Sequence, residues 1–126
     1  MLRVTMVVLG GALGSLARFG LTSVTQRWAG PAFPLGTLVV NVFGCFAAGL
    51  LAAWLATRAQ GAESARLFGI VGVLGGFTTF SAFGLDTLAL LRDGRTTAAL
   101  GNVAANVLLG LGAVALGWCA ARGLVS

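Results

Sequence analysis

The polar side chains of this sequence that could do chemistry lie mostly inside apolar stretches, and nearly all are neutral. Asparagine amides and serine or threonine hydroxyls can donate hydrogen bonds, and the edge of a phenylalanine ring is partially positive. Phe80 and Phe83 are three residues apart, so a helix would place both rings on one face. Hydrogen-bond donors and ring edges, with no Glu, Lys or His in the middle of the apolar stretches, suit a small anion better than a cation or a proton-coupled substrate. The polar set is Arg18, Thr37, Asn41, Thr78, Thr79, Ser81, Asp86, Asn102 and Asn106.

These residues also have purely structural interpretations. Asn41 could join two helices by a hydrogen bond, and the two phenylalanines could pack in a core. Arg18 could extend to the membrane interface, and Asp86 could itself be interfacial. Asn102 and Asn106 share a helix face, which suits either a polar track or interhelical hydrogen bonds.

The elements that must position these side chains are membrane-spanning helices. The chain has 126 residues, of which 58% are hydrophobic and 9% charged, and its mean hydropathy is +0.99. A soluble domain carries about 25% charged residues, so we expect an all-α membrane protein with a single domain, residues 1–126. We expect no enzyme, because no nucleophile–base pair or metal-ligand cluster is visible. The lone Cys45 and Cys119 make neither a disulfide framework nor a metal site.

Four apolar segments, at 4–28, 35–57, 67–91 and 96–121, each reach the ~20 residues that cross a bilayer. They predict four transmembrane helices joined by short loops. The first segment begins like a signal peptide, but its apolar character continues past residues 15–17, so we expect that it is not cleaved. The pairs Gly10/Gly14 and Gly72/Gly76 predict close approach between helices.

The stretch 69–86, GIVGVLGGFTTFSAFGLD, is a poor sequence for a plain helix. Its paired glycines are followed by β-branched threonines, and both features disfavour helix. We therefore expect the third transmembrane helix to be broken here. A break persists in lipid only where protein or water satisfies the freed backbone groups, and freed carbonyls could also bind a cation.

The arginines hardly specify an orientation in the membrane. With four spans, Arg18 lies within the first and is left uncounted; one side of the membrane then carries four arginines and the other three. A chain that inserts both ways could pair with an inverted copy about an axis in the membrane plane, so we expect a homodimer and favour an antiparallel one. The net charge of +5 comes from arginines near segment ends, which indicates lipid headgroups and not nucleic acid. The two sets are Arg3, Arg58, Arg66 and Arg122 against Arg27, Arg92 and Arg95.

Three motifs in order, GGALGSLARFG, GTLVVNVFGCFAAG and GVLGGFTTFSAF, resemble those of the Fluc (CrcB-type) fluoride channel family, over essentially the whole chain. The resemblance implies an antiparallel, dual-topology homodimer with two narrow pores that export fluoride passively across the inner (plasma) membrane of a bacterium. It implies Asn41 as the pore amide, Phe80 and Phe83 as the ring edges that meet the ion, and further pore residues Arg18, Thr79 and Ser81. It also implies a central Na⁺ held by the backbone carbonyls of Gly75 and Thr78 with the same groups of the partner.

The sequence departs from the family pattern in its third and fourth segments. Ala82 and Gly84 stand where the family often has hydroxyls, and Asp86 where it often has Glu. Asn102 and Asn106 stand where Tyr and Ser are common, and they remain candidate pore donors. The alternatives are a small drug or cation exporter, which should carry a carboxylate in its first segment, and a non-transporting membrane subunit.

Overall fold

The computed structural model describes residues 1–58 and 61–125, and their regular structure consists of helices only. Residues 59, 60 and 126, which the predicted single domain includes, lie outside the described residues. The all-α prediction is confirmed. The helices are α1 (Leu2–Ala29), α2 (Leu35–Leu55), α3 (Ala62–Ala65), the π-helical η1 (Arg66–Leu74), α4 (Gly75–Phe77), α5 (Phe80–Arg92) and α6 (Thr96–Val125).

Within the described chain, four helical stretches are long and apolar enough to cross a membrane, as the sequence predicts. Helix α3 begins at Ala62 and not near 67, because Gly61 adopts φ 76° and starts the helix there. Glycine accepts this left-handed conformation without a steric penalty. The stretches are Leu2–Ala29, Leu35–Leu55, Ala62–Arg92 and Thr96–Gly123.

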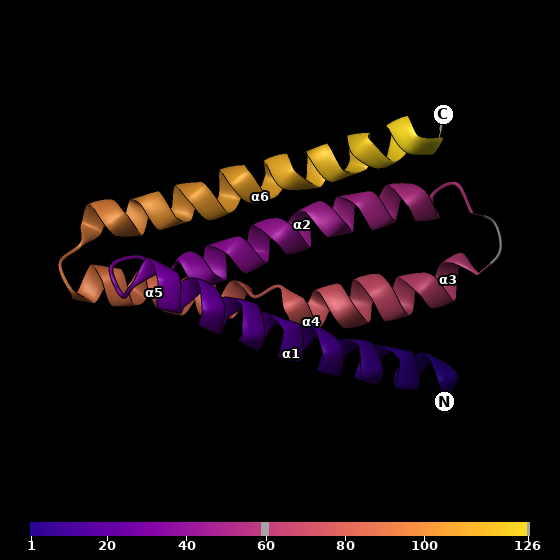
Figure 1. Cartoon of the computed structure of the whole chain (residues 1–126), viewed down its shortest axis with the longest axis horizontal. Helices are drawn as coiled ribbons and strands as arrows, with labels where there is room; N and C mark the ends of the chain where they lie inside the picture. The colour runs from indigo at the N-terminus through magenta and orange to yellow at the C-terminus, as the bar shows by residue number, and fades with distance from the viewer. Residues whose placement is uncertain (59–60, 126) are drawn as a thin grey trace.

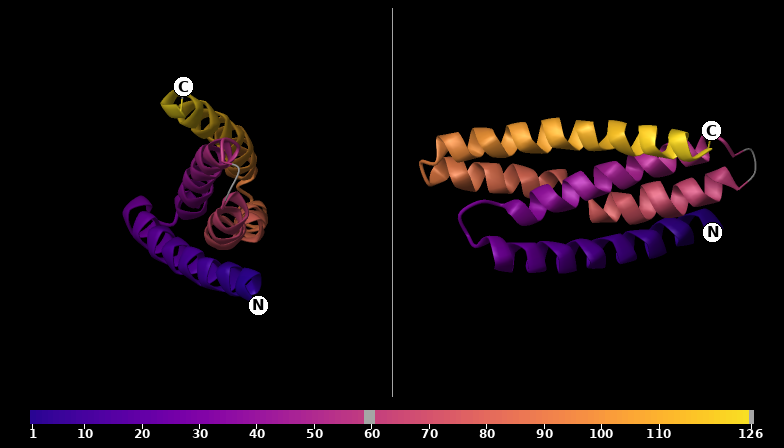
Figure 2. Two further views of the ribbon diagram at one scale, coloured as in Figure 1. Left: turned by 90° about the vertical axis from the view of Figure 1, so that its right-hand side faces the viewer. Right: turned by 45° about the horizontal axis from the view of Figure 1, so that its top comes forward.

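The four rods lie roughly antiparallel along the long axis of the molecule (Figure 1). The start of α1, the end of α2, the start of α3 and the end of α6 share one end of the molecule, while the α1–α2 and α5–α6 turns share the other. Helices α1 and α6 lie on opposite outer sides, with α2 and the rod formed by α3 to α5 between them (Figure 2).

Glycines allow the rods to approach each other closely. A Cβ atom on Gly14 would lie 2.0 Å from the Val73 carbonyl oxygen, and one on Gly76 would lie 2.4 Å from that of Gly11. Cβ atoms on Gly10 and Gly72 would also meet the facing backbone, so the predicted glycine-mediated packing of these two segments is confirmed. Close backbone contact of this kind is how membrane helices gain van der Waals energy where lipid offers no hydrophobic drive.

The outer surface is apolar. Leu16, Phe19, Leu108, Leu111 and Leu116 are each more than 60% exposed, with many further large apolar side chains on α1 and α6. So much exposed apolar surface would be a liability in water, and it matches a molecule whose surroundings are lipid or another membrane chain.

Candidate functional site

The third rod is interrupted between α4 and α5. Thr78 (φ −80°, ψ 157°) and Thr79 (φ −151°, ψ 113°) are extended, whereas Gly75 and Gly76 keep helical conformation. The Thr78 hydroxyl donates to the Leu74 carbonyl at 2.9 Å. The Thr79 hydroxyl accepts the Ala82 N–H at 3.2 Å and so caps α5. The two threonine side chains thus end one helix and start the next.

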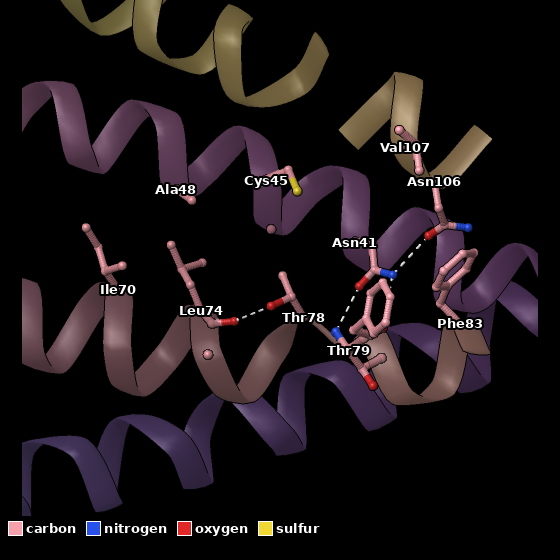
Figure 3. A pocket seen from close by; sticks show the side chains of 13 residues that line it. Asn41, Cys45, Ala48, Ile70, Leu74, Thr78, Thr79, Phe83, Asn106 and Val107 are labelled. Carbon is pink, nitrogen blue, oxygen red and sulfur yellow. Dashed lines mark hydrogen bonds between the residues drawn. The ribbon is translucent and has the colours of Figure 1, made fainter. Parts of the chain in front are cut away.

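Asn41 of α2 supplies hydrogen-bond partners for the backbone N–H and carbonyl of Thr79, whose conformation is extended and not helical. Its Oδ1 accepts the Thr79 N–H at 2.8 Å (Figure 3), and its Nδ2 donates to the Thr79 carbonyl at 3.1 Å. The same Nδ2 donates to Asn106 Oδ1 at 3.0 Å. The Asn41 amide therefore replaces a stretch of regular backbone pairing, and both of its N–H donors are committed.

Two polar side chains of α1 approach the interruption from the opposite side. Arg18 Nη1 donates to the Thr78 carbonyl at 3.4 Å, and the Ser15 hydroxyl donates to the Gly76 carbonyl at 3.5 Å. Neither bond is short, but both lie where the carbonyls have lost helical partners. Half-buried Arg18 thus contacts the interrupted backbone, and within the described part of the chain its remaining N–H groups are left for a ligand.

Two pockets adjoin the interruption, and Thr79 lines both. The first, of about 400 Å³, lies between α2, α6 and the interrupted rod and is almost wholly apolar apart from Asn41, Thr78, Thr79 and Asn106 (Figure 3). The second, of about 480 Å³, lies between α1, α2 and α5 and is lined by polar residues that include Arg18, Thr22, Thr37 and Ser81.

The two predicted aromatic residues meet at the first pocket. Phe80 is 82% exposed in the single chain, while Phe83 is 9% exposed. Their ring centroids lie 5.3 Å apart with planes inclined at 55°. A tilted pair can bring the positive edge of one ring toward the negative face of the other, and both rings line the pocket.

The donors that remain uncommitted gather at the second pocket. The Thr79 and Ser81 hydroxyls lie 3.2 Å apart, and because the bond between them uses only one proton, the other hydroxyl proton has no partner among the described residues. The guanidinium of Arg18 lines the same pocket. A hydroxyl proton and a cation on one wall can bind an anion by hydrogen bonds and charge together.

Asn102 and Asn106 of α6 form a hydrogen-bonded pair beside Asn41. Asn106 lines the first pocket, whereas Asn102 is 0% exposed. The sequence suggested them as pore donors or as interhelical partners, and the structure gives both of them interhelical bonds.

Two contributors were not among the candidates chosen from the sequence: Thr87 joins the asparagine pair, and Ser15 contacts the interruption. Thr37 and Asp86 belong to the predicted polar set, but their pairing was not predicted: the Thr37 hydroxyl donates to Asp86 Oδ2 at 2.6 Å in a third pocket of about 440 Å³ near the α1–α2 turn. The four-residue spacing of Phe83 and Thr87 would have placed Thr87 on the aromatic face of the helix. No spacing rule pairs Thr37 with Asp86, which come from different helices.

The structure offers no side-chain metal centre within the described residues. No group of three or more His, Cys, Asp or Glu residues is close enough to hold a metal there. Cys45 and Cys119 are both free thiols.

Residues 5–118 match the model of the family described as "CrcB-like protein, Camphor Resistance (CrcB)". The chain belongs to this family. Among its relatives, a protein of Paracoccus denitrificans is 53% identical over 94% of this chain and 93% of its own. Another from Hyphomonas neptunium is 49% identical, over 93% and 94%, and one from Rhizobium etli is 45% identical, over 98% and 99%. Each of the three carries the name "Fluoride-specific ion channel FluC".

Proposed function

We propose that this chain is the subunit of a fluoride-selective channel that lets fluoride leave the cytoplasm passively. The observation that carries the proposal is that relatives of 45–53% identity, aligned over almost the whole chain, are named fluoride-specific ion channels. The donor-lined interruption supports it, because a small, strongly hydrated anion can give up its water only where other donors replace it. The same relatives favour a channel over a drug exporter or a non-transporting subunit.

Arg18, Asn41, Thr79, Ser81, Phe80, Phe83 and Asn106 form the proposed pore lining, with Asn102 behind them. Fluoride meets hydroxyl and guanidinium donors at the α1–α5 pocket and ring edges at the α2–α6 pocket. Because fluoride is the base of a weak acid, the neutral acid can enter a cell and ionise inside. The membrane potential, worth about 2.3 kcal/mol per charge per 100 mV, then drives the anion out.

The proposal includes a discontinuous third transmembrane helix and an antiparallel, dual-topology homodimer in the bacterial inner membrane. Phe80 lies exposed on an open pocket of the single chain, where a second copy would cover it. The near-equal distribution of arginines on the two sides is compatible with insertion in both orientations.

A Na⁺ ion at the dimer axis is the remaining part of the proposal. The Gly75 carbonyl lacks its regular helical partner, because the Thr79 N–H donates to Asn41 instead, and Gly75 is exposed. The Thr78 carbonyl accepts from Arg18 at 3.4 Å and has a second lone pair. These carbonyls fit as hard oxygen ligands, and the ion would supply a fixed positive charge between the two copies. Two carbonyls are too few to hold a Na⁺ ion alone, so the proposed site needs the same groups of the partner.

The function is tested with purified protein in liposomes loaded with potassium fluoride or potassium chloride, with valinomycin to balance charge and an ion electrode outside. We expect rapid fluoride efflux and no chloride efflux above that of protein-free liposomes. Equal efflux of both ions, or none of fluoride, would overturn the proposal.

Orientation has its own test. The substitution Thr96→Cys, in a chain where Cys45 and Cys119 are replaced by Ala, puts one exposed thiol near the α5–α6 turn. An impermeant maleimide added to sealed cells or spheroplasts should label about half of the copies under dual topology. Complete labelling, or none before lysis, would show a single orientation.

A further inference from the structure

A directional chain of hydrogen bonds runs from α5 through α6 to Asn41. It begins at Thr87, whose hydroxyl donates to the Phe83 carbonyl one turn earlier at 2.8 Å. Since that proton is committed, the Thr87 oxygen can only accept, and it accepts from Asn102 Nδ2 at 2.9 Å.

The chain continues along one face of α6. With its nitrogen on Thr87, Asn102 turns its Oδ1 toward Asn106 Nδ2, 3.0 Å away. Asn106 Nδ2 also donates to the Asn102 backbone carbonyl at 3.0 Å, so both of its N–H groups are used. Its Oδ1 is left to accept from Asn41 at 3.0 Å.

Each amide in this chain has one satisfied orientation. If Asn102 turned over, its NH₂ group would face the NH₂ group of Asn106, and two donors would meet without an acceptor. A reversed Asn106 would likewise set its NH₂ against the NH₂ of Asn41. The chain is held at both ends: the Thr79 backbone fixes the amide of Asn41, and Thr87, whose proton is committed to the Phe83 carbonyl, supplies the acceptor for the buried NH₂ group of Asn102.

Thr87 and Asn102 do not themselves line the two pockets at the interruption. Asn102 is completely buried, and Thr87 is half-buried. Any influence on an ion must therefore pass through Asn106 and Asn41, which do line the α2–α6 pocket.

We propose that Thr87 is a positioning residue of the pore, which holds Asn102 and, through it, Asn106 in the orientation that sets the Asn106 Oδ1 against the amide of Asn41. The proposal rests on the fluoride-channel function proposed above. It assigns Thr87 and Asn102 a role through other side chains, without contact to the ion.

The test compares Thr87→Val, which keeps the shape but removes the hydroxyl, with Thr87→Ser, which keeps the hydroxyl. Fluoride efflux is measured in the liposome assay after size-exclusion chromatography has shown that each variant assembles as the wild type does. We expect Thr87→Val to slow efflux about tenfold, equivalent to ~1.4 kcal/mol, and Thr87→Ser to retain most of the rate. Thr97→Val, at an exposed threonine of α6, is the matched control and should behave as the wild type.

Coupling to Asn106 separates positioning from packing. In an Asn106→Ala background, the amide through which Thr87 acts is absent, so Thr87→Val should slow efflux no further. A full tenfold effect in that background, equal loss in Thr87→Val and Thr87→Ser, or a wild-type rate in Thr87→Val would each overturn the inference. If Thr87→Val does not fold, Thr87→Ala removes the same hydroxyl without added bulk and takes its place. Absence of fluoride efflux in the wild type would instead defeat the proposed function.

Discussion

Removing the Asn41 amide should collapse the geometry at the interruption. In Asn41→Ala, the Thr79 N–H, the Thr79 carbonyl and Asn106 Oδ1 all lose their partner. The adjoining pocket of about 400 Å³ can admit water, so we count each bond at its net value of about 1 kcal/mol and not at its larger dry cost. Three bonds give ~3 kcal/mol, and a population shift of that size lowers the rate about a hundredfold.

The assay is fluoride efflux from liposomes at matched protein density, with assembly checked by size-exclusion chromatography. Thr57→Ala is the control, because it removes one exposed hydrogen bond to the Trp54 carbonyl just after α2. It should leave efflux unchanged. If Asn41→Ala kept more than about a third of the wild-type rate, less than 1 kcal/mol would separate the two, and the claim that this amide holds the interruption would be wrong.

Two further predictions address the aromatic residues and the packing. Phe80→Ile should slow fluoride efflux about three- to tenfold, which corresponds to the loss of one aromatic edge interaction. It should leave folding intact, because Phe80 is 82% exposed in the single chain. Efflux at the wild-type rate would show that Phe80 does not contact the ion and only packs. Gly49→Ala should lower the thermal stability in detergent by about 1–3 kcal/mol, since its Cβ would lie 2.1 Å from the Val114 carbonyl oxygen. A Cβ on Gly112 would have nothing within 4 Å in this chain, so Gly112→Ala should leave the thermal stability unchanged. Equal stability of the two glycine variants would refute the close α2–α6 contact.

Four helices and their close glycine contacts were predictable, because long apolar runs and small-residue pairs carry direct physical signals. Which residues would carry the extended backbone of the interruption was less predictable. Paired Gly75 and Gly76 suggested the irregular backbone, yet they stay helical and the extended residues are Thr78 and Thr79. Gly76 is instead small because α1 packs on it. Propensity describes a residue in isolation, and here tertiary packing decides what the glycines do.

The partners of polar side chains were harder still to predict. Asn41 was a clear candidate, but its two-bond pairing with the Thr79 backbone depends on how α2 crosses the third rod. The Thr37–Asp86 and Thr87–Asn102 bonds likewise join residues 49 and 15 positions apart. A sequence shows which side chains need a partner inside a membrane, and the register of packed helices determines which partner they find.

The interruption itself explains why isolated polar residues occur in otherwise apolar helices. Extended backbone at membrane depth exposes groups that lipid cannot satisfy. Asn41, placed in the run LVVNVF, serves Thr79 from one side, while Arg18 in LARFG and Ser15 serve Thr78 and Gly76 from the other. An uninterrupted third helix would leave the Asn41 and Arg18 side chains without these acceptors, at a cost of the same order as the interruption. The polar residues of α1 and α2 and the irregular backbone of the third rod therefore stabilise each other, and a change to one side should weaken the other.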